Sequence, residues 1–273
     1  MCTVKNPGFR KRKRFIRSWH ASLPAFSSVL ASLRSGKMKE DENHVLINYS
    51  NGKYVYHGKD AGFEYAYKTQ NGKTFWRYIF RHSLPLRECY HYEILEKLSI
   101  PVPQILAVGD TRKFFVLKES FLITSFLKDT FDGRIFMEGG KYRNGHENLC
   151  FAYCRKNLLY LAKLHDAGFF HKAAHPRNFL FRETGNDHEP EIFWIDVARL
   201  RKSYCRKRAV VMDLHTFFRD MLLPEENVLQ LLKIYMEKVE KKVFPSEKEL
   251  FEALLHFKRR PFSKKKYKIT ART

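Results

Sequence analysis

The sequence predicts an α+β fold in which a strand-rich lobe precedes a helix-rich lobe. Two Asn-Gly pairs, at residues 51–52 and 71–72, each lie between runs of alternating apolar and polar residues, and this arrangement is a strong hairpin signal. From residue 147 onward, apolar residues recur at helical spacing instead. Two such lobes are expected to leave a cleft where they join, and a cleft is the usual place for a ligand site.

The strand-rich part contains short alternating runs and one helix. We expect the helix over residues 86–98, where apolar residues have helical spacing and Pro101 and Pro103 end the pattern. We expect strands over residues 44–50, 53–58, 63–70, 73–82, 104–110, 114–120 and 121–127.

The helix-rich part follows a linker-like stretch at residues 129–145. Its first helix covers residues 147–167 and stops at Gly168, because glycine is common just past a helix end. A strand hairpin over 178–181 and 191–196 follows, and then helices over 210–222, 225–240 and 246–257. We divide the chain into a basic N-terminal extension (1–45), a β-rich N-lobe (46–130), a helical C-lobe (131–257) and a basic tail (258–273).

The composition indicates a folded protein with an anionic partner. Of the 273 residues, 44% are hydrophobic, which is too apolar for a disordered chain. The formal net charge of +22 fits nucleic acid, phospholipid head groups or a phosphorylated glycolipid. No apolar run approaches the ~20 residues that cross a bilayer. The five cysteines are scattered and form no CxxC pair, so a reduced, cytoplasmic protein is expected.

The N-terminal extension has three interpretations. A basic block at residues 10–14 precedes a mildly apolar segment at residues 19–33, which is the order found in a signal peptide. The apolar segment is rich in serine, contains Pro24 and lacks a small-x-small cleavage site, so this interpretation is disfavoured. A basic, partly amphipathic segment on an anionic membrane and a disordered basic arm both remain open.

The stretch GFFHKAAHPRNFLF at residues 168–181 carries the most chemical information. His171 is followed seven residues later by Asn178 and an apolar strand, and Asp196 comes eighteen residues after that, at the end of another apolar strand. A loop asparagine and a strand-end aspartate can converge on a Mg²⁺ ion that bridges nucleotide phosphates. Kinases use this layout in their catalytic loop, where the histidine braces the loop. The third residue of the kinase motif is normally an aspartate, which takes the proton of the attacking hydroxyl.

These motifs resemble those of a known family. HKAAHPRN is similar to the HxDxHPxN loop of small-molecule and sugar kinases, and FWIDVARLR resembles the IDxxR segment of the Kdo/WaaP lipopolysaccharide core kinases. RECYHYEILEKLSIPVPQILAVGD resembles the family's glutamate-bearing helix and the strand leading to the hinge, and SFLITSFL resembles its hinge strand. VVMDLHTFFRDML resembles a later helix that supports the loop. The resemblance covers roughly residues 65–240.

The resemblance implies a bilobal protein-kinase-like fold, with a small β-rich N-lobe and a helical C-lobe, that uses ATP and Mg²⁺. It places Glu88 opposite the nucleotide-binding lysine and Asp213 beneath the catalytic loop that contains His171. It makes Asn178 and Asp196 both metal ligands and nucleotide-binding residues.

The resemblance also implies phosphorylation of an inner-core sugar, a heptose or Kdo, by a peripheral protein at the cytoplasmic face of the inner membrane. An anionic glycolipid or an anionic membrane surface is the expected partner. Six basic residues lie just past the metal site, where an acceptor would be presented: Arg199, Arg201, Lys202, Arg206, Lys207 and Arg208. A solvated basic loop is the alternative. Nucleic acid is the weaker partner, because no nucleic-acid-binding module is present.

The sequence departs from the family pattern at the catalytic positions. Ala173 stands where the proton-accepting aspartate belongs, and the nucleotide-binding lysine is expected to be missing, with Arg77 or Tyr78 at its site. The nearest glycine-rich loop, GKDAG, is a weak signal. A positioned base contributes roughly 10²–10⁴-fold, so a pseudokinase or very weak kinase is expected. The alternative is a working but atypical kinase in which His175 or His171 partly substitutes.

Overall fold

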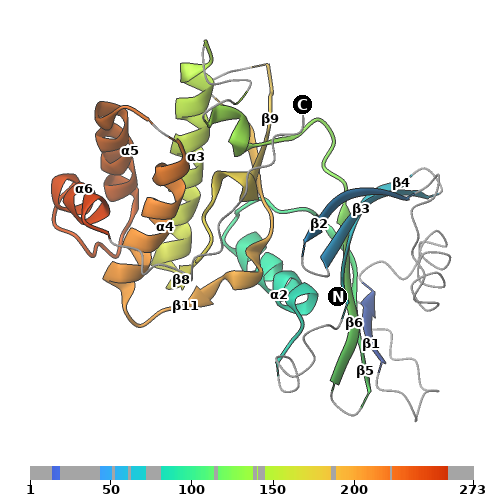
Figure 1. Ribbon diagram of the computed structural model, residues 1–273. Helices are drawn as coiled ribbons and strands as arrows, with labels where there is room; N and C mark the ends of the chain where they lie inside the picture. The colour runs from blue at the N-terminus through green and yellow to red at the C-terminus, as the bar shows by residue number, and fades with distance from the viewer. Residues whose placement is uncertain are drawn as a thin grey trace.

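The computed structural model has a strand-rich lobe and a helical lobe, joined by the segment after the last long strand (Figure 1). It describes residues 14–18, 44–50, 53–60, 63–71, 81–113, 116–137, 140, 145–185, 189–221 and 223–257. The predicted α+β order is confirmed, because a six-stranded sheet precedes helices α3 to α6. Within these residues, no helix is both long and apolar enough to cross a membrane.

The N-lobe sheet is antiparallel throughout, in the order β1-β5-β6-β4-β3-β2. Its strands are β1 (Arg14–Ser18), β2 (His44–Ser50), β3 (Lys53–Asp60), β4 (Phe63–Asn71), β5 (Ile105–Lys113) and β6 (Val116–Ser125). The predicted extension 1–45 therefore contributes β1 to this sheet. The domain boundaries themselves stay predictions.

Two strand predictions have different outcomes. The separate strands expected over 114–120 and 121–127 are wrong, because β6 runs unbroken from Val116 to Ser125. It pairs on one side with β5 and on the other with β4. The strand expected over 73–82 falls mostly on residues 72–80, which lie outside the described residues.

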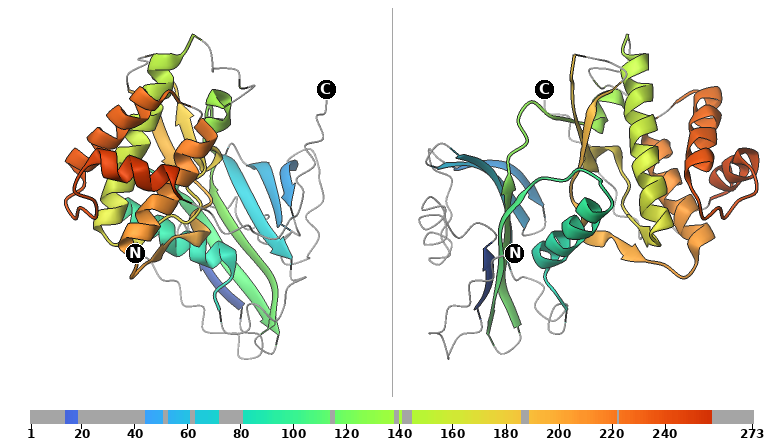
Figure 2. Two further views of the ribbon diagram at one scale, coloured as in Figure 1. Left: turned by 60° about the vertical axis from the view of Figure 1, so that its left-hand side comes forward. Right: turned by 180° about the vertical axis from the view of Figure 1, so that it is seen from behind.

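Helix α2 (Leu84–Lys97) packs between the sheet and the helical lobe, as the view from behind shows (Figure 2). The Ser83 hydroxyl accepts the Leu86 amide at its first turn, and Pro85 is tolerated there because no helical partner is required. Its buried face includes Glu88, His91 and Tyr92. The helix therefore carries polar side chains into the interior between the lobes.

The helical lobe begins with β7 (Phe131–Asp132) and a 3-10 turn, η2 (Gly133–Phe136), inside the stretch expected to be a linker. The remaining elements are α3 (Glu147–Asp166), β8 (Phe169–Phe170), η3 (Pro176–Asn178), β9 (Phe179–Arg182), β10 (Glu191–Trp194), η4 (Val197–Arg199), β11 (Arg201–Lys202), α4 (Arg206–Met221), α5 (Glu225–Lys238) and α6 (Glu247–Leu255). The expected hairpin is present, because β9 and β10 pair antiparallel.

One hydrophobic core runs from the inner face of the sheet through α2 into the helical lobe. It joins Val108 and Leu122 of the sheet, Leu95 of α2, and Trp194 and Phe217 of the helical lobe. The backbone N–H of Trp194 also donates to the carbonyl oxygen of Pro101, just after α2, at 2.9 Å. The shared core and this hydrogen bond hold β10 beside the segment that follows α2.

Candidate functional site

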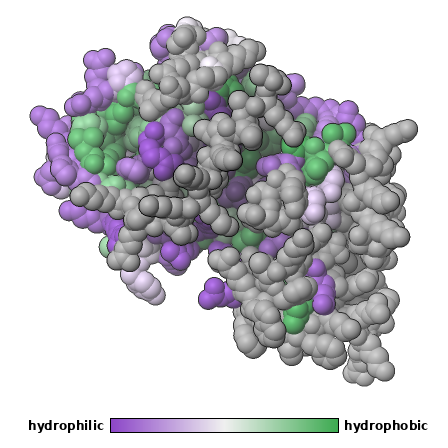
Figure 3. Space-filling view, in the orientation of Figure 1, coloured by the Kyte–Doolittle hydropathy of each residue, from purple (hydrophilic) through white to green (hydrophobic). Residues whose placement is uncertain are grey.

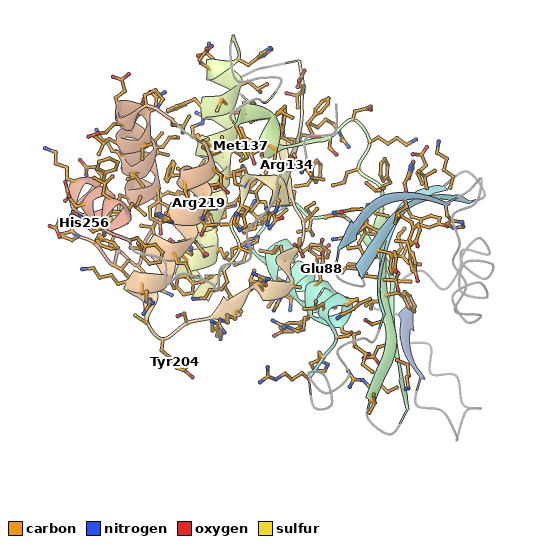
Figure 4. All side chains as sticks on the ribbon, in the orientation of Figure 1. Glu88, Arg134, Met137, Tyr204, Arg219 and His256 are labelled. Carbon is orange, nitrogen blue, oxygen red and sulfur yellow. The ribbon has the colours of Figure 1, made fainter. Side chains whose placement is uncertain are left out.

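An ion pair joins the central sheet to α2. The Lys68 ammonium on β4 lies 2.5 Å from the Glu88 Oε1 atom, and the two side chains are 23% and 6% exposed. β4 places Lys68 on the opposite face from Tyr65 and Tyr67, because side chains alternate along a strand. Figure 4 shows Glu88 on α2 at the side that faces the sheet.

The negative charge of Asp196 also acts on Lys68. Burial lowers the pKa of Lys68, but the negative charges of Glu88 and then Asp196 outweigh burial and leave the pKa raised. A protonated lysine that is paired with one carboxylate is suited to bind the phosphates of a nucleotide, because its ammonium has further N–H donors to offer. The three side chains come from β4, α2 and the end of β10.

The expectation that no lysine faces Glu88 is wrong, because Lys68 occupies that place. Arg77, which was expected there, lies outside the described residues. The signal that could have found Lys68 is Ala66-Tyr67-Lys68, which fits the A-x-K part of the V-A-I-K strand signature and lies twenty residues before Glu88.

The loop before β9 is held from beneath by a buried carboxylate. Asp213 on α4 accepts the backbone N–H of His171 at 2.7 Å and that of Lys172 at 2.8 Å. The His165 Nε2 atom lies 3.3 Å from the same carboxylate, and the His165 Nδ1 atom lies 2.8 Å from the Tyr235 hydroxyl. Lys172 has a positive φ of 63°, so these backbone bonds hold the loop in a turn that side-chain-bearing residues rarely adopt.

His171 is buried between aromatic rings. Its ring centroid lies 5.4 Å from the rings of Phe179 and Trp194, and neither ring nitrogen has a hydrogen-bond partner among the described residues. Burial lowers the pKa of His171 to about 4, although the nearby charge of Asp213 opposes this shift. His171 therefore packs as a neutral ring under the loop.

Asn178 and Asp196 lie at the ends of neighbouring segments. Asn178 donates its amide N–H to the carbonyl oxygen of Ala173 at 2.9 Å, which fixes the orientation of the amide. The carbonyl oxygen of Asn178 accepts the N–H of Ile195 at 2.9 Å, which brings the loop next to Asp196. Asp196 is exposed and has a positive φ of 53°.

The donor set fits Mg²⁺ rather than a metal caged by the protein. Among the described residues, no three His, Cys, Asp or Glu side chains form a metal-binding group. Mg²⁺ commonly takes only one or two protein oxygens and completes its shell with phosphates and water. The Asn178 amide oxygen and the Asp196 carboxylate supply that number.

Ala173 itself has no titratable group, and its side chain is almost fully buried. The nearest ionisable loop residue after it is His175, whose Nδ1 atom lies 3.1 Å from the Asp220 carboxylate on α4. Burial raises the pKa of Asp220, but hydrogen bonds from His175 and Arg219 outweigh burial and lower it to about 2. His175 is thus tied to a carboxylate rather than to the cleft pair.

Two other features do not belong to the cleft. Gly58 of the GKDAG stretch lies in β3, and a Cβ atom there would overlap the Tyr65 ring, so packing accounts for this glycine. A groove of about 460 Å³ lies between α4 and α6, lined in part by Val211, Phe244 and Phe257. Figure 3 shows hydrophobic side chains among hydrophilic ones on the helical lobe.

The strand-rich lobe, the Lys68–Glu88 pair and the helical lobe define a protein with protein-kinase-like architecture. A family model described as the lipopolysaccharide kinase (Kdo/WaaP) family matches residues 51–235. The chain therefore belongs to that family.

Comparison with solved structures agrees on the fold. WaaP, in a structure with acyl carrier protein, matches with a TM-score of 0.60 and 18% identity, over 84% of this chain and 89% of WaaP. A double mutant of the PknI kinase domain from Mycobacterium tuberculosis matches with a TM-score of 0.45 and 14% identity, over 78% of this chain and 95% of that domain. The PknI score is too low to support an argument. A search of curated proteins found no match.

Proposed function

We propose that this chain binds Mg-ATP in the cleft between its lobes and is related to enzymes that phosphorylate an inner-core sugar, a heptose or Kdo, with weak or lost turnover. The observation that carries the proposal is the Lys68–Glu88 ion pair within the field of Asp196. In this role Lys68 binds phosphate oxygens, and Asn178 and Asp196 hold the metal. The bound Mg²⁺ would neutralise charge on the nucleotide phosphates.

The slow step is proton removal from the acceptor. Ala173 cannot accept a proton, and His175 is engaged by Asp220. Phosphoryl transfer depends mainly on positioning and electrostatics, so the intact Lys68–Glu88 pair supports residual activity. Weak turnover is therefore favoured over complete loss.

The direct test is transfer of radiolabelled phosphate from ATP to purified core oligosaccharide. Wild-type protein should label the oligosaccharide slowly, and Asp196→Ala should label it at background level. Equal labelling by the two proteins would show that this cleft does not carry the reaction.

The second candidate is a pseudokinase that binds nucleotide or serves as a scaffold at the membrane surface, and Ala173 is the observation that favours it. It predicts that Mg-ATP raises the melting temperature without any transfer. A melting temperature unaffected by Mg-ATP would leave only the scaffold role.

The acceptor side of this proposal is an anionic glycolipid or an anionic membrane surface, approached from the cytoplasm by a peripheral protein. Five exposed cations support it: Arg199, Arg201, Lys202, Lys207 and Arg208. The sixth residue of the run, Arg206, donates to the His165 carbonyl oxygen instead. The first turn of α4 carries no acid, so its basic residues oppose the helix dipole. Concentrating positive charge there costs stability and favours an anionic partner.

A further inference from the structure

Tyr92 is placed to act on the cleft through Glu88. It lies one helical turn after Glu88 on α2 and is fully buried. Its hydroxyl donates to the Glu88 Oε1 atom at 2.7 Å, the same oxygen that accepts Lys68 at 2.5 Å. One carboxylate oxygen therefore receives two donors, one from β4 and one from α2 itself, and both restrain the carboxylate.

The same phenol reaches the segment that carries Asp196. The backbone of Asp196 hydrogen-bonds to the Tyr92 oxygen. The preceding residue on α2, His91, has its Nδ1 atom 2.8 Å from the carbonyl oxygen of Val197. Two consecutive side chains of α2 thus contact two consecutive residues just after β10, Asp196 and Val197.

Packing alone does not account for the Tyr92 hydroxyl. A phenylalanine ring would fill the same buried position without a polar atom to satisfy. Burying a hydroxyl is costly unless it is hydrogen-bonded, and here both of its partners belong to cleft residues. The structure assigns Tyr92 as a positioning residue that ties Glu88 to the Asp196 backbone and so sets the spacing of the Lys68 ammonium and the Asp196 carboxylate. This inference rests on the proposed nucleotide site.

The test is the Kd of Mg-ATP for Tyr92→Phe, measured by calorimetric titration. A hydrogen bond to a charged group contributes enough that the Kd should rise about 10-fold. Tyr65→Phe is the matched control. Tyr65 is also a buried tyrosine of the N-lobe, its hydroxyl lies 2.6 Å from the His44 Nε2 atom, and it faces away from Lys68. Both variants should lose similar thermal stability without nucleotide, and only Tyr92→Phe should bind Mg-ATP more weakly.

A double-mutant cycle separates positioning from general loosening of the fold. If Tyr92 acts through Glu88, then Tyr92→Phe should change the Kd less than about 3-fold when Glu88→Ala is already present. Equal effects of Tyr92→Phe in both backgrounds would overturn the inference, as would a Kd for Tyr92→Phe within 2-fold of the wild-type value.

Binding and transfer report on different claims. Binding of Mg-ATP that depends on Tyr92, without phosphate transfer, would sustain this inference and refute the proposed enzymatic activity. Phosphate transfer that Tyr92→Phe does not change would support the enzymatic activity and refute this inference. A wild-type protein that binds no Mg-ATP would overturn both.

Discussion

At the residue scale, the proposed site combines the Lys68–Glu88 ion pair with an alanine, Ala173, that cannot accept a proton. Asn178 is hydrogen-bonded to the carbonyl oxygen of Ala173, and the chain also provides the Lys68–Glu88 ion pair and the Asp196 carboxylate. In the proposed function, the molecule therefore binds a nucleotide while lacking one part of the transfer step.

Restoring a carboxylate at this position should raise transfer without altering binding. Ala173→Asp is expected to increase the rate of phosphate transfer by about 10²-fold, because a positioned base contributes 10²–10⁴-fold. Initial rates of radiolabel transfer measure the change, and the Kd of Mg-ATP should stay within 2-fold of wild type. An unchanged rate would mean that proton removal does not limit this protein.

His171 makes stability depend on pH. The pKa of His171 is about 4 in the folded protein, whereas its ordinary value is 6.5. Between pH 4 and pH 6.5 the unfolded chain therefore binds more protons than the folded protein. The contribution of His171 to stability is fully present above pH 6.5 and is lost as the pH falls toward 4. The expected loss between pH 7 and pH 5 is about 2 kcal/mol.

Urea unfolding at pH 7 and pH 5 checks this value. His171→Leu removes the titrating group but keeps an apolar side chain between Phe179 and Trp194. This variant should lose about 2 kcal/mol less than wild type over the same pH interval. If wild type and His171→Leu lost the same stability between pH 7 and pH 5, groups other than His171 would cause the pH dependence.

At the element scale, strands β3 and β4 approach closely at one point. Gly58 of β3 pairs with Tyr65 of β4, and the Tyr65 ring occupies the space that a Gly58 side chain would fill. The close approach lets a large aromatic side chain pack into the outer core of the sheet with Tyr56 and Tyr67.

Gly58→Ala should therefore destabilise the protein by about 1–3 kcal/mol, the usual cost of overpacking. Thermal or urea unfolding measures the loss. In a Tyr65→Leu background the added methyl group has room, so the same substitution should cost less than half as much. A full cost in that background would point to backbone conformation rather than the ring.

The helices and strands could be predicted from the sequence more readily than the contacts between them. The helix over 147–167 and the hairpin at 178–196 follow from local spacing and turn residues, and both are present. Lys68 was missed because its role depends on Glu88, twenty residues away, and on which strand lies across from α2. Strand β6 was divided in two because Lys118 and Glu119 interrupt its apolar run, although pairing with β5 on one side and β4 on the other carries the strand through them.

At the scale of the whole molecule, α2 connects the two lobes. Glu88 reaches the sheet, whereas His91 and Tyr92 reach the end of β10. The hydrophobic core is continuous across the same contact. One helix therefore contacts both lobes through a single set of side chains.

The most direct measurement is a crystal structure with Mg²⁺ and a non-hydrolysable ATP analogue. We expect the nucleotide phosphates beside the Lys68 ammonium, and a metal ion bound by the Asn178 amide oxygen and the Asp196 carboxylate. Glu88 should remain paired with Lys68. A nucleotide bound elsewhere, or a Lys68 side chain turned away from the phosphates, would contradict the nucleotide site on which this account depends.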